Sequence, residues 1–108
     1  MDFDRLIERA ISIQSIPAPT FQEVKRRRYV QDEFEQAELV DIEIDSVGNL
    51  LGRVPGKKKP PLIISAHLDS VFPKDTPLEI QHLGDRIVGP GIGDNAISLA
   101  VLVELAFD

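Results

Sequence analysis

Cysteine is absent from this sequence, and its absence limits the kinds of site that the chain can build. Neither a disulfide framework nor a thiolate metal centre can form, so any metal must be bound by imidazole and carboxylate groups. No apolar run approaches the roughly 20 residues that a membrane-spanning helix needs, and the acidic start carries no secretory signal. We therefore expect a cytoplasmic protein with no membrane partner.

Positive charge is also in short supply. The sequence has 12 Lys and Arg residues against 18 Asp and Glu residues, which gives a net charge of −6 at pH 7. Such an acidic chain is poorly suited to phosphate backbones, so we expect no nucleic-acid partner. The composition, 43% hydrophobic and 28% charged, is that of a soluble globular protein, and 108 residues suffice for one domain, residues 1–108.

Two helices are predicted in the first third of the chain. Apolar residues at helical spacing predict an amphipathic helix of about three turns from Phe3. Thr20 precedes Glu23 by three positions, a capping-box pattern that predicts a second helix running to about Ala37. We interpret the basic run at residues 25–28 as a solvated face, with recognition of an anionic group as the alternative.

A change of period after residue 39 predicts strands. Alternating apolar and acidic residues at 40–44 indicate a strand with one face in water, paired with residues 50–54. The continuous apolar run at 62–66 is typical of a strand buried on both faces, and a hairpin is predicted with its turn at 82–85. The expected fold is therefore α/β, with helices packed on a mixed sheet.

Residues 95–107 are apolar nearly all round, which predicts a helix buried on most sides. Too little chain precedes this helix to cover it, and it has no closing cap or strand, so we expect the sequence to be part of a longer chain. Glu104 is interpreted as an ordinary helix residue, and His82 as a turn residue without a function.

Candidate chemistry begins where the apolar run ends, at Ser65-Ala66-His67-Leu68-Asp69. Residues two apart in a strand project to the same side, so one ring nitrogen of His67 is a candidate metal ligand. Asp69 can then accept a hydrogen bond from the other ring nitrogen and orient the ring. A structural His–Asp pair at a loop mouth is the alternative.

A second candidate, Asp94, lies in a glycine-rich turn that opens the last helix. Gly89, Gly91 and Gly93 allow the backbone to turn sharply or to approach a ligand closely. Taken alone, Asp94 reads as a helix N-cap. If its side chain points toward the same space as His67, its carboxylate could serve as a ligand that bridges two cations.

These segments resemble the two metal motifs of the zinc metallopeptidase family that contains peptidase T, aminoacylase, acetylornithine deacetylase and glutamate carboxypeptidase. Residues 65–73 look like the first motif and residues 89–96 look like the second. The spacing of 27 positions between His67 and Asp94 is also within the family's range. Further similar segments lie at residues 44–49, 53–56 and 84–86, so that the resemblance covers essentially the whole chain.

The resemblance implies a two-metal hydrolase of peptides or N-acyl amino acids. It implies two Zn²⁺ ions, which Co²⁺ or Mn²⁺ could replace, with His67 binding one ion, Asp94 bridging both and Asp69 acting as a neighbouring active-site residue. It also implies a cis peptide bond after Asp94. Ser98 stands where relatives usually carry Gly. The family's Glu-Glu pair, a further acidic ligand and a distant His are expected beyond residue 108.

We therefore expect the amino-terminal fragment of a zinc-dependent peptidase or amidohydrolase, inactive alone because the general base is missing. One alternative is a free-standing interaction module that forms a homodimer through the last helix, covering Val101 and Leu105. The other is a non-catalytic structural fragment.

Overall fold

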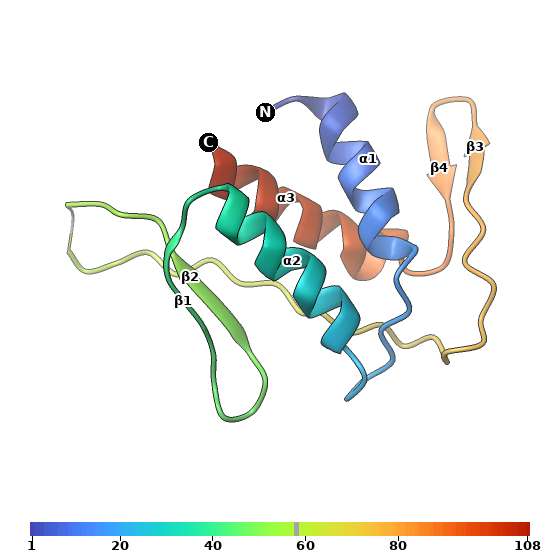
Figure 1. Cartoon of the computed structure of the whole chain (residues 1–108). Helices are drawn as coiled ribbons and strands as arrows, with labels where there is room; N and C mark the ends of the chain where they lie inside the picture. Colours follow the sequence, from blue (N-terminus) through green and yellow to red (C-terminus); the bar gives the residue numbers. More distant parts are fainter. Residues whose placement is uncertain (58) are drawn as a thin grey trace.

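The computed structural model describes residues 1–57 and 59–108 of the chain. The elements in chain order are α1 (Phe3–Gln14), α2 (Val24–Gln36), β1 (Val40–Ile44), β2 (Leu50–Arg53), β3 (Gln81–Leu83), β4 (Arg86–Val88), the π-helical turn η1 (Ile92–Ala96) and α3 (Ile97–Phe107). Figure 1 shows α3 beside both α1 and α2, with the two β-hairpins on opposite sides of the helices. Among the described residues, no helix combines the length and apolar character that crossing a bilayer requires.

Helix α1 forms where its apolar stripe predicts it. Asp2 caps the helix, since its side chain accepts hydrogen bonds from the backbone N–H groups of Asp4 and Arg5. The buried face of α1 packs against η1 and α3, and these elements share one core cluster. The buried members of that cluster are Leu6, Ala10, Ile13, Ala96, Leu99 and Ala100.

A buried ion-pair cluster ties α3 to α1. The Glu104 side chain is 0% exposed and accepts hydrogen bonds from Arg5 at 2.9 Å and Arg9 at 3.0 Å. Arg9 also pairs with Glu33 of α2 at 2.7 Å, so the cluster joins all three helices. The interpretation of Glu104 as an ordinary helix residue was therefore wrong, because the helix turns its single internal carboxylate toward two arginines that lie far away in sequence.

Helix α2 begins later than the capping-box pattern predicts. The N-cap is Glu23, whose side chain makes no capping hydrogen bond, and Thr20 bonds to Asp69 instead. The capping-box interpretation was therefore wrong. The chain between the two helices turns with Phe21 at a φ of 70°, a left-handed conformation that separates Thr20 from the helix.

The basic run at residues 25–28 is only partly solvated. Lys25 and Arg28 are exposed, but Arg26 is 2% exposed and therefore contradicts the predicted solvated face. The Arg26 guanidinium donates to the carbonyl of Ile16 at 2.7 and 3.2 Å and to that of Leu68 at 2.9 Å. It thus joins the loop after α1 to the segment that carries His67.

The α/β class is confirmed, with two antiparallel hairpins supplying the strands. Strands β1 and β2 pair with Val40 opposite Arg53 and Ile44 opposite Leu50. Strands β3 and β4 pair around a shorter turn than expected, so His82 lies in β3, exposed, opposite Ile87. A parallel bridge outside the named strands joins Pro19 to Ser70.

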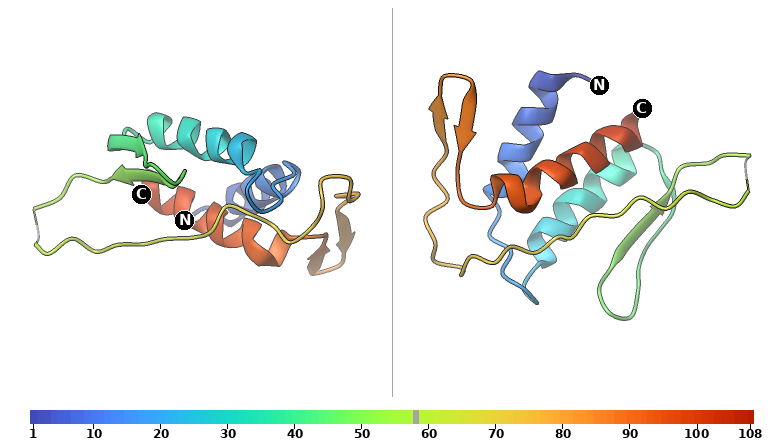
Figure 2. Two further views of the ribbon diagram at one scale, coloured as in Figure 1. Left: turned by 90° about the horizontal axis from the view of Figure 1, so that it is seen from below. Right: turned by 180° about the vertical axis from the view of Figure 1, so that it is seen from behind.

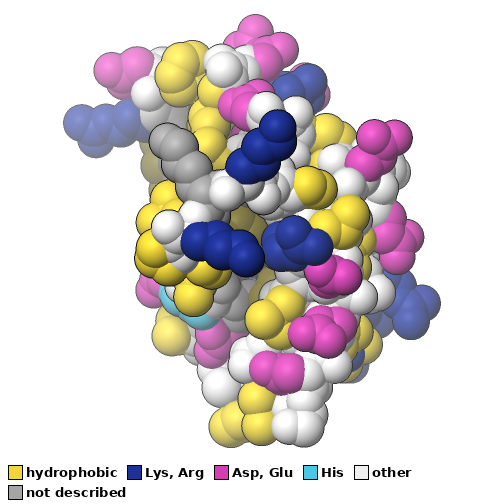
Figure 3. All heavy atoms as spheres, turned by 90° about the vertical axis from the view of Figure 1, so that its left-hand side faces the viewer, with side chains coloured by type: hydrophobic (Ala, Val, Ile, Leu, Met, Phe, Trp, Pro, Cys, Tyr) yellow, Lys and Arg dark blue, Asp and Glu magenta, His cyan; other side chains and the backbone are white. Residues whose placement is uncertain are grey.

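The predicted strand at residues 62–66 does not form. Leu62, Ile63 and Ile64 are 87%, 84% and 56% exposed, and no strand pairs with this segment among the described residues. Figure 2 shows the segment as a long connection that runs past the helices. Apolar side chains also lie open among charged ones on the face drawn in Figure 3. The pattern of a buried strand was present, but the described residues supply no neighbours to bury it.

Replacing Glu104 by Gln should destabilise the chain, because the amide cannot neutralise Arg5 and Arg9. We expect a loss of about 3 kcal/mol in the free energy of unfolding, near the lower end for buried pairs because Arg5 is half exposed. Urea denaturation near neutral pH measures this loss, and Glu8→Gln on the exposed face of α1 is the matched control. Equal midpoints for the two variants would contradict the structural role of Glu104.

The ion pair between Glu104 and Arg5 also predicts that the stability of the fold depends on pH. The hydrogen bond from Arg5 is the main influence holding the pKa of Glu104 below its ordinary value of 4.5. Because the folded state favours the ionised carboxyl, its contribution is present above the ordinary pKa and is lost as the pH falls through the lowered value. The stability difference between the wild-type chain and Glu104→Gln should therefore shrink on acidification below pH 4.5.

Replacing Arg26 by Met should loosen the contact between the loop after α1 and the His67 segment. Two carbonyls lose their donors, so we expect a stability loss of about 2 kcal/mol. The amide of Ser70, which donates to the Ala18 carbonyl at 2.7 Å, should also exchange its hydrogen faster. Arg28→Met is the control, since Arg28 is exposed on the same helix. Equal Ser70 protection in both variants would refute this role.

Candidate functional site

The structure brings His67, Asp69 and Asp94 together in one row of hydrogen bonds. The Nδ1 atom of His67 lies 3.0 Å from Oδ1 of Asp69 and 3.1 Å from its backbone oxygen. The Nε2 atom lies 3.0 Å from Oδ1 of Asp94. The imidazole is therefore held between two carboxylates that are 25 residues apart in the sequence.

Asp94 reaches this position from the turn before α3. Its backbone angles, φ −135° and ψ 89°, are non-helical, and its side chain caps neither η1 nor α3. The N-cap interpretation was therefore wrong. The side chain is 73% exposed and points to His67, and the Asp94–Asn95 peptide bond is cis, as the family resemblance implied.

Two glycines of the turn, Gly89 and Gly91, meet different structural constraints. A side chain at Gly89 would meet the Cδ1 atom of Ile80 at 2.5 Å, so the Ile80 side chain would have to shift. Gly91 has a φ of 78°, the left-handed region that favours glycine. The side-chain amide of buried Gln14 holds this turn, because its nitrogen donates to the carbonyls of Pro90 at 2.9 Å and Leu78 at 3.2 Å. The sequence pattern of α1 gave no sign of this role for Gln14.

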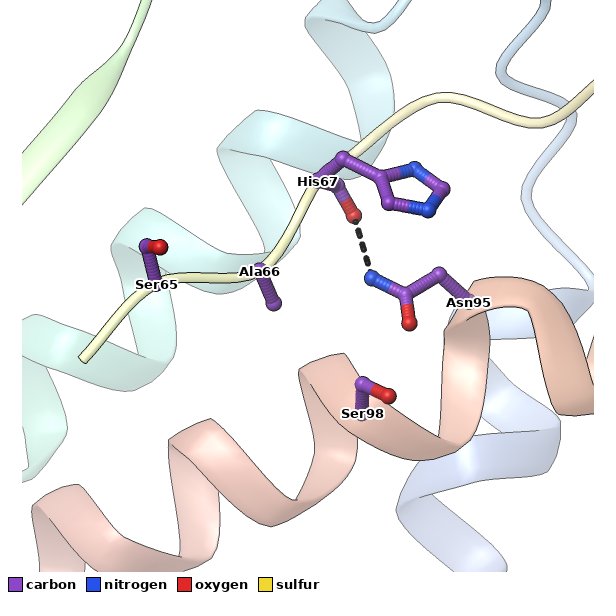
Figure 4. A pocket seen from close by; sticks show the side chains of 5 residues that line it. All are labelled: Ser65, Ala66, His67, Asn95 and Ser98. Atoms are coloured by element: carbon purple, nitrogen blue, oxygen red, sulfur yellow. Dashed lines mark hydrogen bonds between the residues drawn. The ribbon is translucent and has the colours of Figure 1, made fainter.

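Asn95 connects the glycine turn to the backbone of the His67 segment. Its side-chain nitrogen donates to the His67 carbonyl at 3.1 Å, and the residue is 8% exposed. Figure 4 shows this bond between two of the five residues that line one hollow, Ser65, Ala66, His67, Asn95 and Ser98. The volume of the hollow is about 510 Å³. Sequence reasoning assigned Asn95 no contact, although its place directly after Asp94 was the available signal. Ser98 is exposed and lines the hollow, so its hydroxyl meets no packing conflict there.

Asp69 is held from the side opposite to His67. The hydroxyl of Thr20 donates to Oδ2 of Asp69 at 2.5 Å, while Oδ1 faces the imidazole. The Thr20 bond is the largest influence that lowers the pKa of Asp69 below its ordinary value of 3.8, and burial opposes it. Asp69 is therefore a carboxylate at neutral pH and accepts at both oxygens. Burial lowers the pKa of the nearby Arg26, and the negative charge of Asp69 opposes that decrease.

The donor set is of the type that binds zinc. Imidazole nitrogen and carboxylate oxygen are both zinc ligands, with bonds of about 2.0–2.2 Å. Two ligands of a tetrahedral ion are then about 3.3 Å apart, so the observed 3.0 Å between His67 Nε2 and Asp94 Oδ1 is close to that spacing. Among the described residues, however, no group of three His, Asp or Glu side chains gathers in ligand geometry. These residues thus fit part of a zinc site.

The contacts of the ring favour one tautomer. Nδ1 faces two acceptors, Oδ1 and the backbone oxygen of Asp69, whereas Nε2 faces one, Oδ1 of Asp94, so the contacts favour a proton on Nδ1 in a neutral imidazole. Nε2 then presents its lone pair to the same space as the Asp94 carboxylate. With a cation in that space, Nε2 and the Asp94 oxygen could both serve as ligands.

Comparison with known proteins identifies the family. Residues 49–107, more than half of the chain, match the family model of peptidase family M28, and this stretch contains His67, Asp69 and Asp94. No curated protein matches the chain. Peptidases of this family are generally zinc-dependent. The chain therefore belongs to peptidase family M28, a family of metallopeptidases.

Proposed function

We propose that this chain supplies metal ligands of a two-metal, zinc-dependent peptidase. In this proposal His67 would hold one ion through Nε2, Asp94 would be the ligand shared by the two ions, and Asp69 orients the imidazole. The observation that carries the proposal is the placement of Nε2 3.0 Å from Asp94 Oδ1 while Asp69 occupies Nδ1. Family membership supports the same assignment, because the matched region contains all three residues.

Each residue has a distinct part in the proposed chemistry. Asp69 keeps the proton on Nδ1 and makes Nε2 the more basic donor. Asp94, at the exposed end of a glycine turn, contributes a negative charge that stabilises a cation beside Nε2. Bound zinc would lower the pKa of a coordinated water and polarise the scissile carbonyl. Asn95 fixes the His67 backbone through the bond to its carbonyl.

The substrates we propose are peptides or N-acyl amino acids, as in peptidase T and aminoacylase. Co²⁺ or Mn²⁺ could replace zinc, since imidazole and carboxylate ligands suit all three ions. Catalytic zinc needs three protein ligands, so hydrolysis requires ligands and a general base in addition to those described here. Glu104 does not serve as that base, because it is buried against Arg5 and Arg9. The cytoplasmic location and the lack of nucleic-acid and membrane partners remain predictions.

The alternative of an interaction module has weaker structural support. Val101 is half-buried and packs against the core cluster of α1 and α3, and Leu105 is 42% exposed. Phe107 of the same helix is 38% exposed, and a few partly exposed apolar side chains are ordinary for a soluble protein and do not by themselves make a docking face. A homodimer through α3 therefore stays a prediction.

Zinc titration of the 108-residue chain by calorimetry tests the proposed function. Removing a ligand should weaken zinc binding by at least about 10-fold, the smallest loss usual for groups that only support a ligand. We expect this loss in His67→Ala and in Asp94→Asn. Because the described site has two donors, the wild-type affinity should be weak.

His82→Ala is the matched control. His82 is the only other histidine in the sequence, and it is exposed in β3 without a described partner. We expect its isotherm to match that of the wild-type chain. Identical isotherms for His67→Ala, His82→Ala and the wild type would overturn the proposed metal role.

A further inference from the structure

Thr20 ends the row of hydrogen bonds that passes through the candidate site. Its hydroxyl donates to Oδ2 of Asp69, Oδ1 of Asp69 faces Nδ1 of His67, and Nε2 of His67 faces Asp94. Four side chains from three separate segments are thus joined in one continuous chain of hydrogen bonds. Thr20 lies 49 positions before Asp69, and neither metal motif contains it.

Backbone contacts place Thr20 beside Asp69. The amide of Ser70 donates to the Ala18 carbonyl at 2.7 Å, and Pro19 forms a parallel bridge with Ser70. The loop before Thr20 therefore runs in register with the segment that contains Asp69. The Arg26 guanidinium also binds both segments, at the carbonyls of Ile16 and Leu68.

The hydroxyl of Thr20 has no role in the neighbouring helix. Helix α2 begins at Val24 after its N-cap residue Glu23, whose side chain makes no capping hydrogen bond. The described hydrogen bond of the Thr20 hydroxyl is the one to Asp69. The side chain therefore acts on the candidate site rather than on local secondary structure.

Two anchored oxygens fix a carboxylate more firmly than one. A carboxylate bound through a single oxygen can rotate about its Cβ–Cγ bond, a broad torsion in Asp. In Asp69, Thr20 occupies Oδ2 and the imidazole occupies Oδ1. Rotation would break both bonds, so the hydroxyl holds Oδ1 in line with Nδ1.

We propose that Thr20 is a positioning residue that locks the Asp69 carboxylate and thereby holds the His67 ring in its Nδ1–H tautomer. The metal-related part of this inference rests on the proposed function, since it presents Nε2 of His67 as the ligand. Partners that orient a metal-binding histidine typically change metal affinity by about 10–100-fold when removed. Thr20 acts one bond further away, so we expect an effect near 10-fold.

Nitrogen-15 NMR of the full 108-residue chain without metal tests the first part. Spectra are recorded at alkaline pH, where imidazoles are neutral. Thr20→Val removes the hydroxyl but keeps the shape of the side chain, and Thr20→Ser keeps the hydroxyl. We expect the Nδ1–H tautomer of His67 to dominate in the wild type and in Thr20→Ser, and the Nε2–H tautomer to rise in Thr20→Val. His82 serves as an internal reference whose tautomer ratio should stay constant.

Two results would overturn the inference. One is an unchanged His67 tautomer ratio in Thr20→Val, and the other is an equal change in Thr20→Val and Thr20→Ser. If the valine variant fails to fold, the wild-type chain still decides the question. The hydroxyl proton of Thr20 should then be visible and slowly exchanging, and its rapid exchange with water would refute the bond to Asp69.

Zinc titration of the same variants separates this inference from the proposed function. A loss of about 10-fold in Thr20→Val, with recovery in Thr20→Ser, supports both. If zinc binds none of the chains, the proposed function fails, while the tautomer ratios still decide whether Thr20 positions the ring. Equal zinc affinity in all three chains would overturn the link between Thr20 and the metal.

Discussion

The Arg26 guanidinium joins two backbone segments that otherwise meet through one parallel bridge, between Pro19 and Ser70. It binds the Ile16 carbonyl on one side and the Leu68 carbonyl on the other, and residues 65–70 belong to none of the named strands of the described chain. Burying a cation without a direct carboxylate partner is costly, and the carbonyl bonds together with attraction to Asp69 offset that cost. The position of His67 therefore depends on one side chain of α2 more than on regular secondary structure.

Helix α1 helps to hold both segments of the site, the one that carries His67 and the one that carries Asp94. Its far end leads into the loop that Arg26 fixes, and Gln14 in its last turn holds the glycine turn that carries Asp94. Near its start, Arg5 and Arg9 fix α3 through Glu104. The segments that carry His67 and Asp94 are thus both held by contacts to α1. The 3.0 Å distance between the two side chains therefore depends on these contacts as well as on their own hydrogen bond.

Local patterns predicted the elements whose causes are local. The apolar stripe of α1, the alternation of β1 and the motif residues His67, Asp69 and Asp94 could all be recognised in short windows. Arg26 could not, because the neighbouring Lys25 and Arg28 are exposed and nothing nearby shows that Ile16 and Leu68 converge on it. The capping-box prediction for Thr20 was wrong for a related reason. Its spacing to Glu23 is typical of a helix cap, but the carboxylate of Asp69, 49 positions away, accepts the hydrogen bond of its hydroxyl instead.

The exposed apolar segment at residues 62–64 has a consequence for the colloidal behaviour of the chain. An exposed run of Leu and Ile side chains is a template for pairing between molecules, which leads to aggregation. The sequence places Lys57, Lys59, Pro60 and Pro61 directly before this run, residues that interrupt such pairing. Repulsion from the net charge of −6 adds long-range protection, and salt screens that repulsion within about 10 Å at 0.1 M. Dilute buffers of low ionic strength therefore favour the dispersed chain.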